Sequence, residues 1–144
     1  MFNLDDCIAF ITARSAKVFV KALEKRFRPY AINRTQWIAM YYIYTGGNIT
    51  QRELADKMAF KEPTVVRMLQ EMEAEGLVTR SGSEADKRVR RLALTEKGEG
   101  ICKTLMPVVE QFKNDTVAGI SQEDLNTLTV TLHKMVENAQ GTKT

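Results

Sequence analysis

The sequence has few of the residues from which catalytic and metal centres are built. Its 144 residues include one histidine and two cysteines, and the cysteines, Cys7 and Cys102, lie far apart. Separated cysteines do not form the closely spaced pairs typical of zinc sites, and they are typical of reduced thiols in a cytoplasm. His133 has no serine or cysteine partner placed by a motif, and no glycine-rich phosphate loop occurs. We therefore expect that the chain is not an enzyme and that it binds no metal and no cofactor. His133 is expected at a surface or an interface.

Long apolar runs and a strong charge of one sign are also missing. No apolar stretch approaches the roughly 20 residues that span a membrane. The acidic start, Met-Phe-Asn-Leu-Asp-Asp, is not typical of a signal peptide. We therefore expect a cytoplasmic chain with no membrane partner. The net charge of +3 permits nucleic-acid binding without requiring it. Whether the chain binds nucleic acid must therefore be argued from where the basic residues lie in the sequence.

The middle of the chain predicts two short helices in succession. Thr50 and Glu53 match a capping box, which predicts a helix that begins at Gln51. Pro63 suits the first turn of a second helix, and Gly76 suits its C-terminal cap. Two short helices joined by about three or four residues are typical of a helix-turn-helix. The apolar residues of the two helices recur at helical spacing: Leu54, Ala55, Met58, Val65, Met68, Leu69 and Met72.

A short hairpin with a basic tip follows the helix pair. Residues 77–79 and 89–94 are β-prone runs, and a polar turn separates them. A helix-turn-helix followed by a basic hairpin predicts a winged helix, so we expect a mostly α fold with a small β wing. Such a module places its second helix in the major groove, and a basic arm can reach a minor groove. The basic residues of the wing are Lys87, Arg88, Arg90 and Arg91.

The hairpin sequence EADKRVRRLALTEKG resembles the wing of the MarR family, the multiple antibiotic resistance regulators. The usual pattern of that family is Asp-x-Arg, several residues, then Leu-Thr-x-x-Gly. The preceding MEAEGLVTR, residues 72–80, is similar to another family signature, and the resemblance covers nearly the whole chain. Pro63 and Val66 depart from it, because many members carry Ser or Thr there. The positions that match the wing pattern are Asp86, Arg88, Leu94, Thr95 and Gly98.

Amphipathic helices are predicted on both sides of this module. An apolar stripe runs from about Leu4 to Phe27, and Asn33 caps a second, aromatic-rich helix. Thr95 can cap a long helix that Pro107 should kink. A last helix with a continuous apolar stripe begins after Ser121.

These stripes exceed what a module of about 65 residues needs for its own core. We expect them to be buried against a second copy by two-fold symmetry, as the resemblance also implies. The alternative is a monomer whose ends pack on its own core. The predicted organisation is an N-terminal dimerisation helix (1–32), a winged helix-turn-helix (33–98) and C-terminal dimerisation helices (99–144).

The second helix of the pair offers side chains that suit base recognition. Arg67 can pair with guanine, Gln70 with adenine, and Val66 can meet a thymine methyl group. Thr64 and Lys61 are expected at phosphates. Asp86 is expected to orient Arg88 or to cap the turn. The predicted DNA-binding residues are Thr50, Gln51, Lys61, Thr64, Val66, Arg67, Gln70, Lys87, Arg88, Arg90 and Arg91.

The sequence therefore predicts a homodimeric regulator of transcription that binds specific double-stranded DNA and represses pseudo-palindromic promoter sites. A winged helix that binds another protein is the alternative, although a basic wing argues against it. A second alternative is a hydroperoxide sensor, because relatives of that kind carry a reactive cysteine in the first helix. Asp5 and Asp6 next to Cys7 disfavour a reactive thiolate, so a structural thiol is favoured.

A small aromatic or phenolic effector is a further expectation. Some relatives bind phenolic carboxylates between the dimerisation region and the DNA-binding module. If this chain does so, Arg14 or Lys17 would meet the carboxylate. Trp37 and Tyr41 either line the pocket for such a ligand or pack in the core beneath the helix pair.

Overall fold

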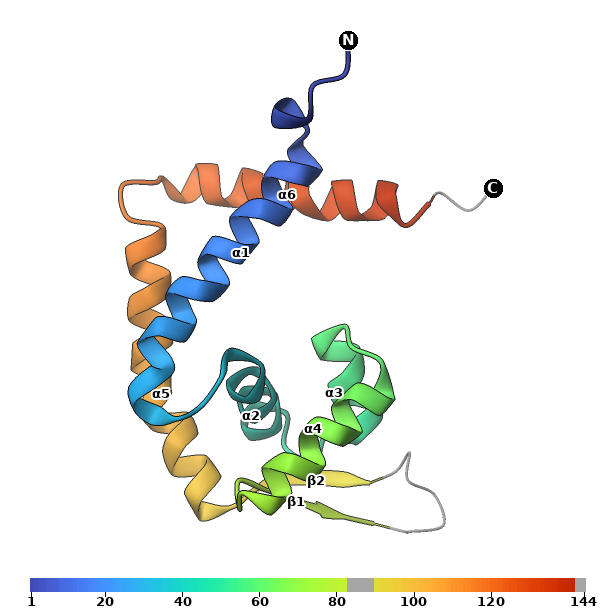
Figure 1. The fold of residues 1–144 in the computed structure, drawn as a ribbon, viewed down its shortest axis with the longest axis vertical. Coiled ribbons are helices and arrows are strands. Elements are labelled where there is room, and N and C mark those ends of the chain that lie inside the picture. Colours follow the sequence, from blue (N-terminus) through green and yellow to red (C-terminus); the bar gives the residue numbers. More distant parts are fainter. Residues whose placement is uncertain (83–89, 142–144) are drawn as a thin grey trace. The chain divides into compact units, whose positions relative to one another are not determined.

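The structure, a computed structural model, describes residues 1–82 and 90–141. It is helical apart from one two-stranded antiparallel sheet, which confirms the predicted mostly α fold with a small β wing. Within the described residues, no helix combines the length and apolarity of a membrane span. The elements are η1 (Leu4–Asp6), α1 (Ile8–Phe27), η2 (Arg28–Tyr30), α2 (Arg34–Gly46), α3 (Gln51–Met58), α4 (Glu62–Ala74), β1 (Val78–Ser81), β2 (Arg91–Leu94), α5 (Glu96–Thr116) and α6 (Gln122–Ala139) (Figure 1).

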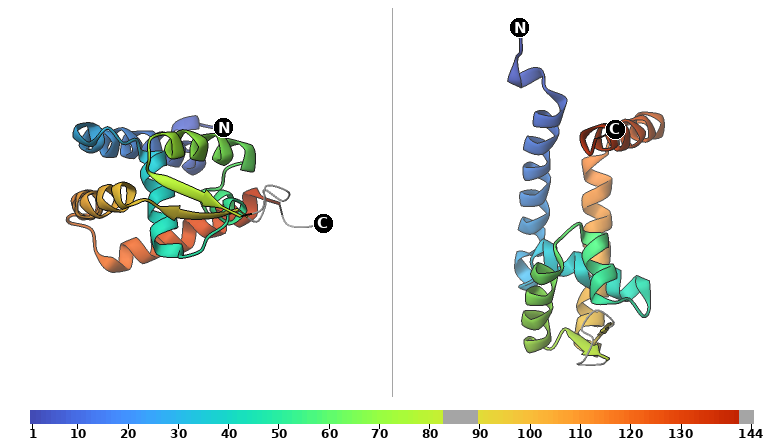
Figure 2. Two further views of the ribbon diagram at one scale, coloured as in Figure 1. Left: turned by 90° about the horizontal axis from the view of Figure 1, so that it is seen from below. Right: turned by 90° about the vertical axis from the view of Figure 1, so that its right-hand side faces the viewer.

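The chain divides into two compact units, Met1–Glu110 and Gln111–Thr144. The first unit holds α1 to α4, the hairpin and most of α5. In it, α3 packs on α2 and α4, and α4 lies beside β1, as both views of Figure 2 show. The second unit holds the end of α5 and α6.

Local capping signals place the helix starts. The Asn33 side chain accepts a hydrogen bond from the Gln36 backbone N–H at 2.8 Å, and Gln36 Oε1 accepts from the Asn33 N–H at 3.1 Å. This confirms the predicted cap of α2. At α3, Thr50 Oγ1 accepts from the Glu53 N–H at 3.1 Å, which is one of the two bonds of the predicted capping box. The first helix differs from the prediction, because the chain becomes extended at Cys7 and separates η1 from α1.

The core of the first unit lies where α2, α3, α4 and the hairpin meet. Met40 of α2 is fully buried there, and Trp37 is 8% exposed. Trp37 stacks on Tyr41, with ring centroids 5.4 Å apart, and contacts Phe27 at 6.1 Å. The aromatic run of α2 thus contributes to the core through Trp37, whereas Tyr41 is 38% exposed at its edge. Other fully buried side chains are Leu54, Val65, Leu69, Met72 and Leu105.

The hairpin gains a third, very short partner from the chain before α3. β1 and β2 pair antiparallel with Val78 opposite Leu94. On the other side of β2, Thr50 forms an isolated antiparallel bridge with Arg91. The start of α3 is thereby attached to the base of the wing.

A close approach between α5 and Leu77, the residue before β1, fixes the end of the hairpin. Thr95 Oγ1 caps α5 by accepting from the Gly98 N–H at 3.0 Å, as the sequence predicted. The Thr95 N–H donates to the Leu77 carbonyl at 3.1 Å. A Cβ atom on Gly98 would lie 2.1 Å from that same carbonyl oxygen, so only glycine fits without a backbone shift. α5 then continues through Pro107 to Thr116.

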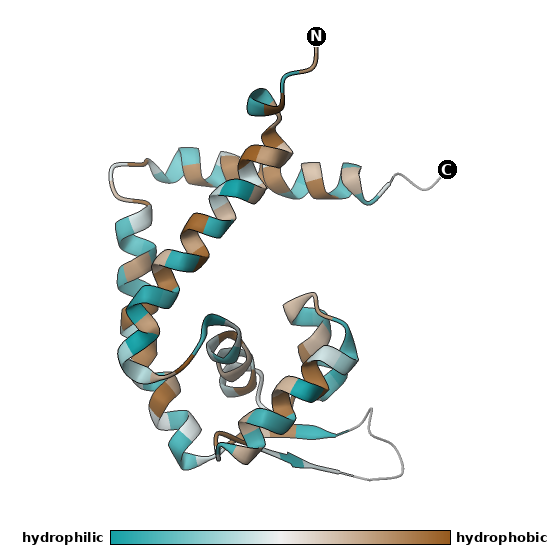
Figure 3. Ribbon diagram, viewed as in Figure 1, coloured by the Kyte–Doolittle hydropathy of each residue, from teal (hydrophilic) through white to brown (hydrophobic). Residues whose placement is uncertain are grey.

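Hydrophobic residues recur along the helices at both ends of the chain (Figure 3), and several of their side chains are exposed. Ser121 caps α6 through its hydroxyl, yet no residue of α6 is buried in the single chain. Leu128 and Val130 of α6 are 55% and 68% exposed. In the first unit, Ile8 and Val18 of α1 are 55% and 62% exposed.

Candidate nucleic-acid interface

α4 presents its polar side to solvent because its apolar side is buried. At about 100° per residue, positions four and seven residues after Pro63 lie on the same face of the helix. These positions are Arg67 and Gln70, and both side chains are exposed. The opposite face is formed by fully buried Val65, Leu69 and Met72.

A shallow groove of about 400 Å³ runs along this exposed face of α4. It brings together three predicted base-reading residues, Val66, Arg67 and Gln70, beside Gln51 at the start of α3. Such a surface combines an apolar group, an amide and a guanidinium, which match the chemistry of base edges in the major groove. The groove also contains Glu62 and Pro63 from the first turn of α4.

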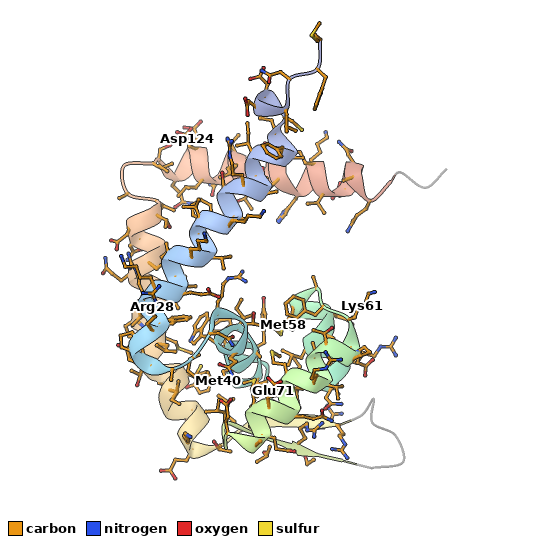
Figure 4. The ribbon with its side chains drawn as sticks, in the orientation of Figure 1. Arg28, Met40, Met58, Lys61, Glu71 and Asp124 are labelled. Atoms are coloured by element: carbon orange, nitrogen blue, oxygen red, sulfur yellow. The ribbon has the colours of Figure 1, made fainter. Side chains whose placement is uncertain are left out.

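The predicted phosphate-binding residues lie at the edge of this surface. Lys61 is the N-cap residue of α4, and its exposed side chain is labelled in Figure 4. Thr64 is exposed in the first turn of the helix but does not line the groove. Both are therefore accessible beside the base-reading face rather than within it.

Thr50 and Gln51 face inward, although the sequence placed them among the DNA-binding residues. Thr50 is 8% exposed, and its hydroxyl caps α3. Gln51 is 1% exposed, and its Oε1 accepts a hydrogen bond from Arg80 NH1 at 3.2 Å. The Thr50 hydroxyl thus serves the start of α3 itself, whereas the Gln51 oxygen joins α3 to the hairpin.

Arg80 and Glu73 form an ion pair that the sequence interpretation missed. Arg80 of β1 donates from NH2 and Nε to the two carboxylate oxygens of Glu73 on α4, at 3.2 and 3.4 Å. The hydrogen bond from Arg80 is the main cause that lowers the pKa of the Glu73 carboxyl below its usual value. No local motif marks this pair, because it joins a helix to a strand.

The base of the wing carries two of the four predicted wing cations. Arg91 is exposed, and its NH1 donates to the Asn48 carbonyl at 2.7 Å. Arg90 is half-buried, and its buried Nε has no hydrogen-bond partner within residues 1–82 and 90–141. The remaining predicted wing residues, Asp86, Lys87 and Arg88, lie outside the described residues.

The four predicted effector-binding residues are spread over α1 and α2. Arg14 is exposed, with its guanidinium 5.5 Å from the Phe10 ring centroid, and Lys17 is also exposed. Trp37 is buried, and its Nε1 has no hydrogen-bond partner among the described residues, whereas Tyr41 is partly exposed.

A larger groove of about 900 Å³ lies elsewhere in the first unit, and none of these four residues lines it. It is bordered by the last turns of α1, the start of α2 and Glu75. Three cations at the end of α1 and just after it line the groove, namely Lys21, Lys25 and Arg28, the last of which is labelled in Figure 4. Their spacing of four and three residues places them on one side of the helix.

The cysteines and the histidine lie in unrelated surroundings. Cys7 is half-buried between η1 and α1. Cys102 is buried in α5, and burial, followed by the nearby Glu99 carboxylate, raises the pKa of its thiol. His133 is exposed on α6. Across the described part of the chain, no group of three or more His, Cys, Asp or Glu side chains could hold a metal ion.

Comparison with known proteins finds a family match over part of the chain and a shared fold over nearly all of it. The sequence model of the MarR family matches residues 32–89, from the start of α2 into the wing. The S. aureus MepR–DNA complex shares the fold with a TM-score of 0.83, at 18% identity, over 94% of this chain and 98% of that chain. Residues 32–89 therefore match the MarR family, and the chain has the winged-helix fold of that solved structure. The resemblance drawn from the wing and the helix pair is thereby confirmed.

Two further solved structures share the fold. CouR from Rhodococcus jostii RHA1, bound to p-coumaroyl-CoA, is 23% identical with a TM-score of 0.81, over 100% of this chain and 99% of that chain. A mutant of E. coli MarR, complexed with operator DNA, is 22% identical with a TM-score of 0.80, over 89% of this chain and 92% of that chain. MarR-family proteins are DNA-binding regulators rather than enzymes.

Proposed function

We propose that the protein is a homodimeric, sequence-specific DNA-binding regulator that represses transcription from pseudo-palindromic promoter sites. The observation that carries the proposal is the groove on α4, where Val66, Arg67 and Gln70 converge next to a basic hairpin. The solved structures of MepR and of the MarR mutant with DNA support it.

In this proposal α4 enters the major groove. Arg67 donates two hydrogen bonds to O6 and N7 of a guanine, and Gln70 pairs with an adenine. Val66 contacts a thymine methyl group. Lys61 and Thr64 bind the flanking phosphates and fix the position of the helix along the duplex.

The wing supplies the electrostatic part of the contact. Arg90 and Arg91 at the base of the wing contribute positive charge beside α4. The sequence-predicted wing residues Lys87 and Arg88 extend the same basic arm, oriented by Asp86. Neutralised phosphates release counterions, which makes the affinity dependent on salt.

The two-fold symmetry of the proposed site requires a dimer. The exposed apolar residues of α6 and of the first half of α1 are the surfaces we assign to the interface. Burying apolar area contributes about 25 cal/mol per Å², so these exposed side chains favour association. Residues 1–32 and 99–144 then form the dimerisation region, and 33–98 form the DNA-binding module.

We further propose that an acidic aromatic molecule weakens DNA binding. The larger groove supports this, because its three cations, Lys21, Lys25 and Arg28, outnumber its two carboxylates, Glu24 and Glu75, and Glu75 directly follows α4. A ligand that binds there contacts the end of the proposed recognition helix. CouR, a structural neighbour, was solved bound to p-coumaroyl-CoA, which contains an aromatic group. Arg14, Lys17, Trp37 and Tyr41 remain the sequence-based candidates for such a site.

The function is tested by selection of duplexes from random DNA. The purified chain should enrich a pseudo-palindrome whose half-sites are centred about 10 base pairs apart or a multiple of that distance. The Arg67→Ala variant should enrich a motif that is relaxed at one position in each half-site. Recovery of random sequences by both proteins would contradict sequence-specific recognition.

A further inference from the structure

Three elements of the candidate interface meet at one side chain. Arg80 of β1 donates to Glu73 of α4 through NH2 and Nε, at 3.2 and 3.4 Å. Its third nitrogen, NH1, donates to Gln51 Oε1 of α3 at 3.2 Å. The guanidinium therefore joins the wing, the proposed recognition helix and the helix before it. We refer to Arg80, Glu73 and Gln51 together as the Arg80 clamp.

We propose that the Arg80 clamp determines DNA sequence preference by fixing the position of α4, without itself contacting DNA. The inference rests on the proposed function, because it concerns how the same site discriminates between sequences. It assigns positioning roles to Arg80, Glu73 and Gln51.

Glu73 is exposed, but the burial of Arg80 and Gln51 argues against a phosphate contact by Arg80. The Arg80 side chain is 10% exposed, and all three of its nitrogens donate to partners within the protein. Gln51 is 1% exposed. A phosphate contact would require the guanidinium to leave both partners. The neighbouring Glu73 carboxylate also offsets the positive charge of Arg80, and the hydrogen bond from Arg80 lowers the pKa of that carboxyl.

The geometry explains why such bonds affect base reading. Apolar packing through Val65, Leu69 and Met72 holds α4 against the core but is weakly directional. A planar guanidinium that pairs with a carboxylate at two positions is directional, so it limits rotation and sliding of the helix. Gln51 also borders the groove that contains Arg67 and Gln70. A small shift of α4 would therefore displace both base-reading side chains.

The clamp and a direct phosphate contact predict different responses to charge. Arg80→Gln removes a positive charge, and Glu73→Gln removes a negative one. If Arg80 bound phosphate, the first change would weaken DNA binding and the second would leave it unchanged or strengthen it. If the pair positions α4, both changes lower discrimination between sequences, although their charges change in opposite directions.

The experiment measures the affinity ratio between the duplex selected by the wild-type chain and a scrambled duplex of equal length. We expect Arg80→Gln and Glu73→Gln each to lower this ratio by about tenfold, chiefly by weakening the selected duplex. Arg80→Lys keeps the charge but lacks the planar fork, and it should not restore the ratio. Glu71→Gln is the matched control, because Glu71 is exposed on α4 and takes part in none of the three Arg80 bonds. Its ratio should equal that of the wild type.

A double variant tests whether Arg80 and Glu73 act as one unit. Either substitution alone already breaks the clamp. The affinity ratio of the Arg80→Gln/Glu73→Gln protein should therefore be no lower than that of the single variant with the lower ratio. If the loss of the affinity ratio in the double variant equals the product of the two single losses, Arg80 and Glu73 act independently, and the clamp is overturned. The inference also fails if Glu73→Gln behaves like Glu71→Gln while Arg80→Gln weakens both duplexes and lowers the salt slope. If the wild type itself does not discriminate, the proposed function fails together with the clamp, whereas unchanged ratios in the variants overturn the clamp alone.

Discussion

The contact between α5 and the hairpin predicts that alanine changes the free energy of unfolding in opposite directions at two glycines of α5. Gly98 and Gly100 both lie near the start of α5. A Cβ atom on Gly98 would lie 2.1 Å from the Leu77 carbonyl oxygen, whereas a Cβ atom on Gly100 would have no neighbour within 4 Å. Alanine is favoured over glycine in a helix by about 0.5–1 kcal/mol, and both substitutions receive this gain.

The cost at Gly98 exceeds that gain. The atom in the way belongs to the backbone of Leu77, and the same carbonyl accepts the Thr95 N–H at 3.1 Å. Relief of the clash requires α5 and β1 to separate, and this movement weakens that hydrogen bond. Overpacking of this kind costs about 1–3 kcal/mol. We expect Gly98→Ala to lower the free energy of unfolding by about 1–2 kcal/mol, and Gly100→Ala to raise it by up to about 1 kcal/mol.

The assay is urea unfolding followed by circular dichroism, at one protein concentration for the wild type and both variants. The sign of the change separates the two glycines even if the magnitudes differ from these figures. Equal stabilisation by both alanines would show that α5 does not approach the hairpin as closely as the structure has it. Since Gly98 also matches the last position of the family pattern, the result gives a physical reason for glycine there.

Further predictions concern DNA contacts, assembly and the thiols. Arg67→Ala should cost about 1–3 kcal/mol on the selected duplex, whereas Arg88→Ala should weaken all duplexes and lower the salt slope by about two per dimer; affinity titrations at several salt concentrations distinguish them. Removal of the residues after Ser121 should give monomers or aggregates in sedimentation, while a monomeric intact chain at micromolar concentration would refute the dimer. Cys7→Ser should bind DNA like the wild type with and without hydroperoxide, and loss of binding in the oxidised wild type alone would restore the sensor alternative. Because the Cys102 pKa is raised, its thiolate fraction at neutral pH is lowered, so native alkylation should be slow and should accelerate only at higher pH.

Local signals in the sequence were sufficient for the starts of α2 and α3 and for the buried face of α4. The side chain of Asn33 or Thr50 caps a helix through bonds to a residue three positions later, so a short stretch contains the whole interaction. The buried face of α4 follows from helical spacing, and Gly76 after it has a φ of 74°, which glycine adopts readily. The extended residue Cys7 was not anticipated, because the apolar stripe continues across it.

Contacts between distant segments could not be predicted in the same way. Arg80 and Gln51 lie 29 residues apart, and only the packing of β1 against both helices brings them together. Gln51 was therefore expected at the DNA, since a polar residue in the first turn of a helix usually faces solvent. The bridge between Thr50 and Arg91 is a single pair, too short to produce an alternating pattern. The space around the Cα atom of Gly98 is limited by the Leu77 carbonyl, so it depends on how the chain before β1 passes α5.

The most direct test of recognition through α4 is the affinity of the wild-type chain and of Arg67→Ala for the selected and scrambled duplexes, measured by fluorescence anisotropy near physiological salt. Specific binding by winged-helix residues predicts that the wild type prefers the selected duplex by about 10³-fold or more. Arg67→Ala should lose about tenfold or more of that preference while its affinity for the scrambled duplex changes little. Equal affinity of the wild type for both duplexes, or an unchanged preference in Arg67→Ala, would contradict base reading by this helix.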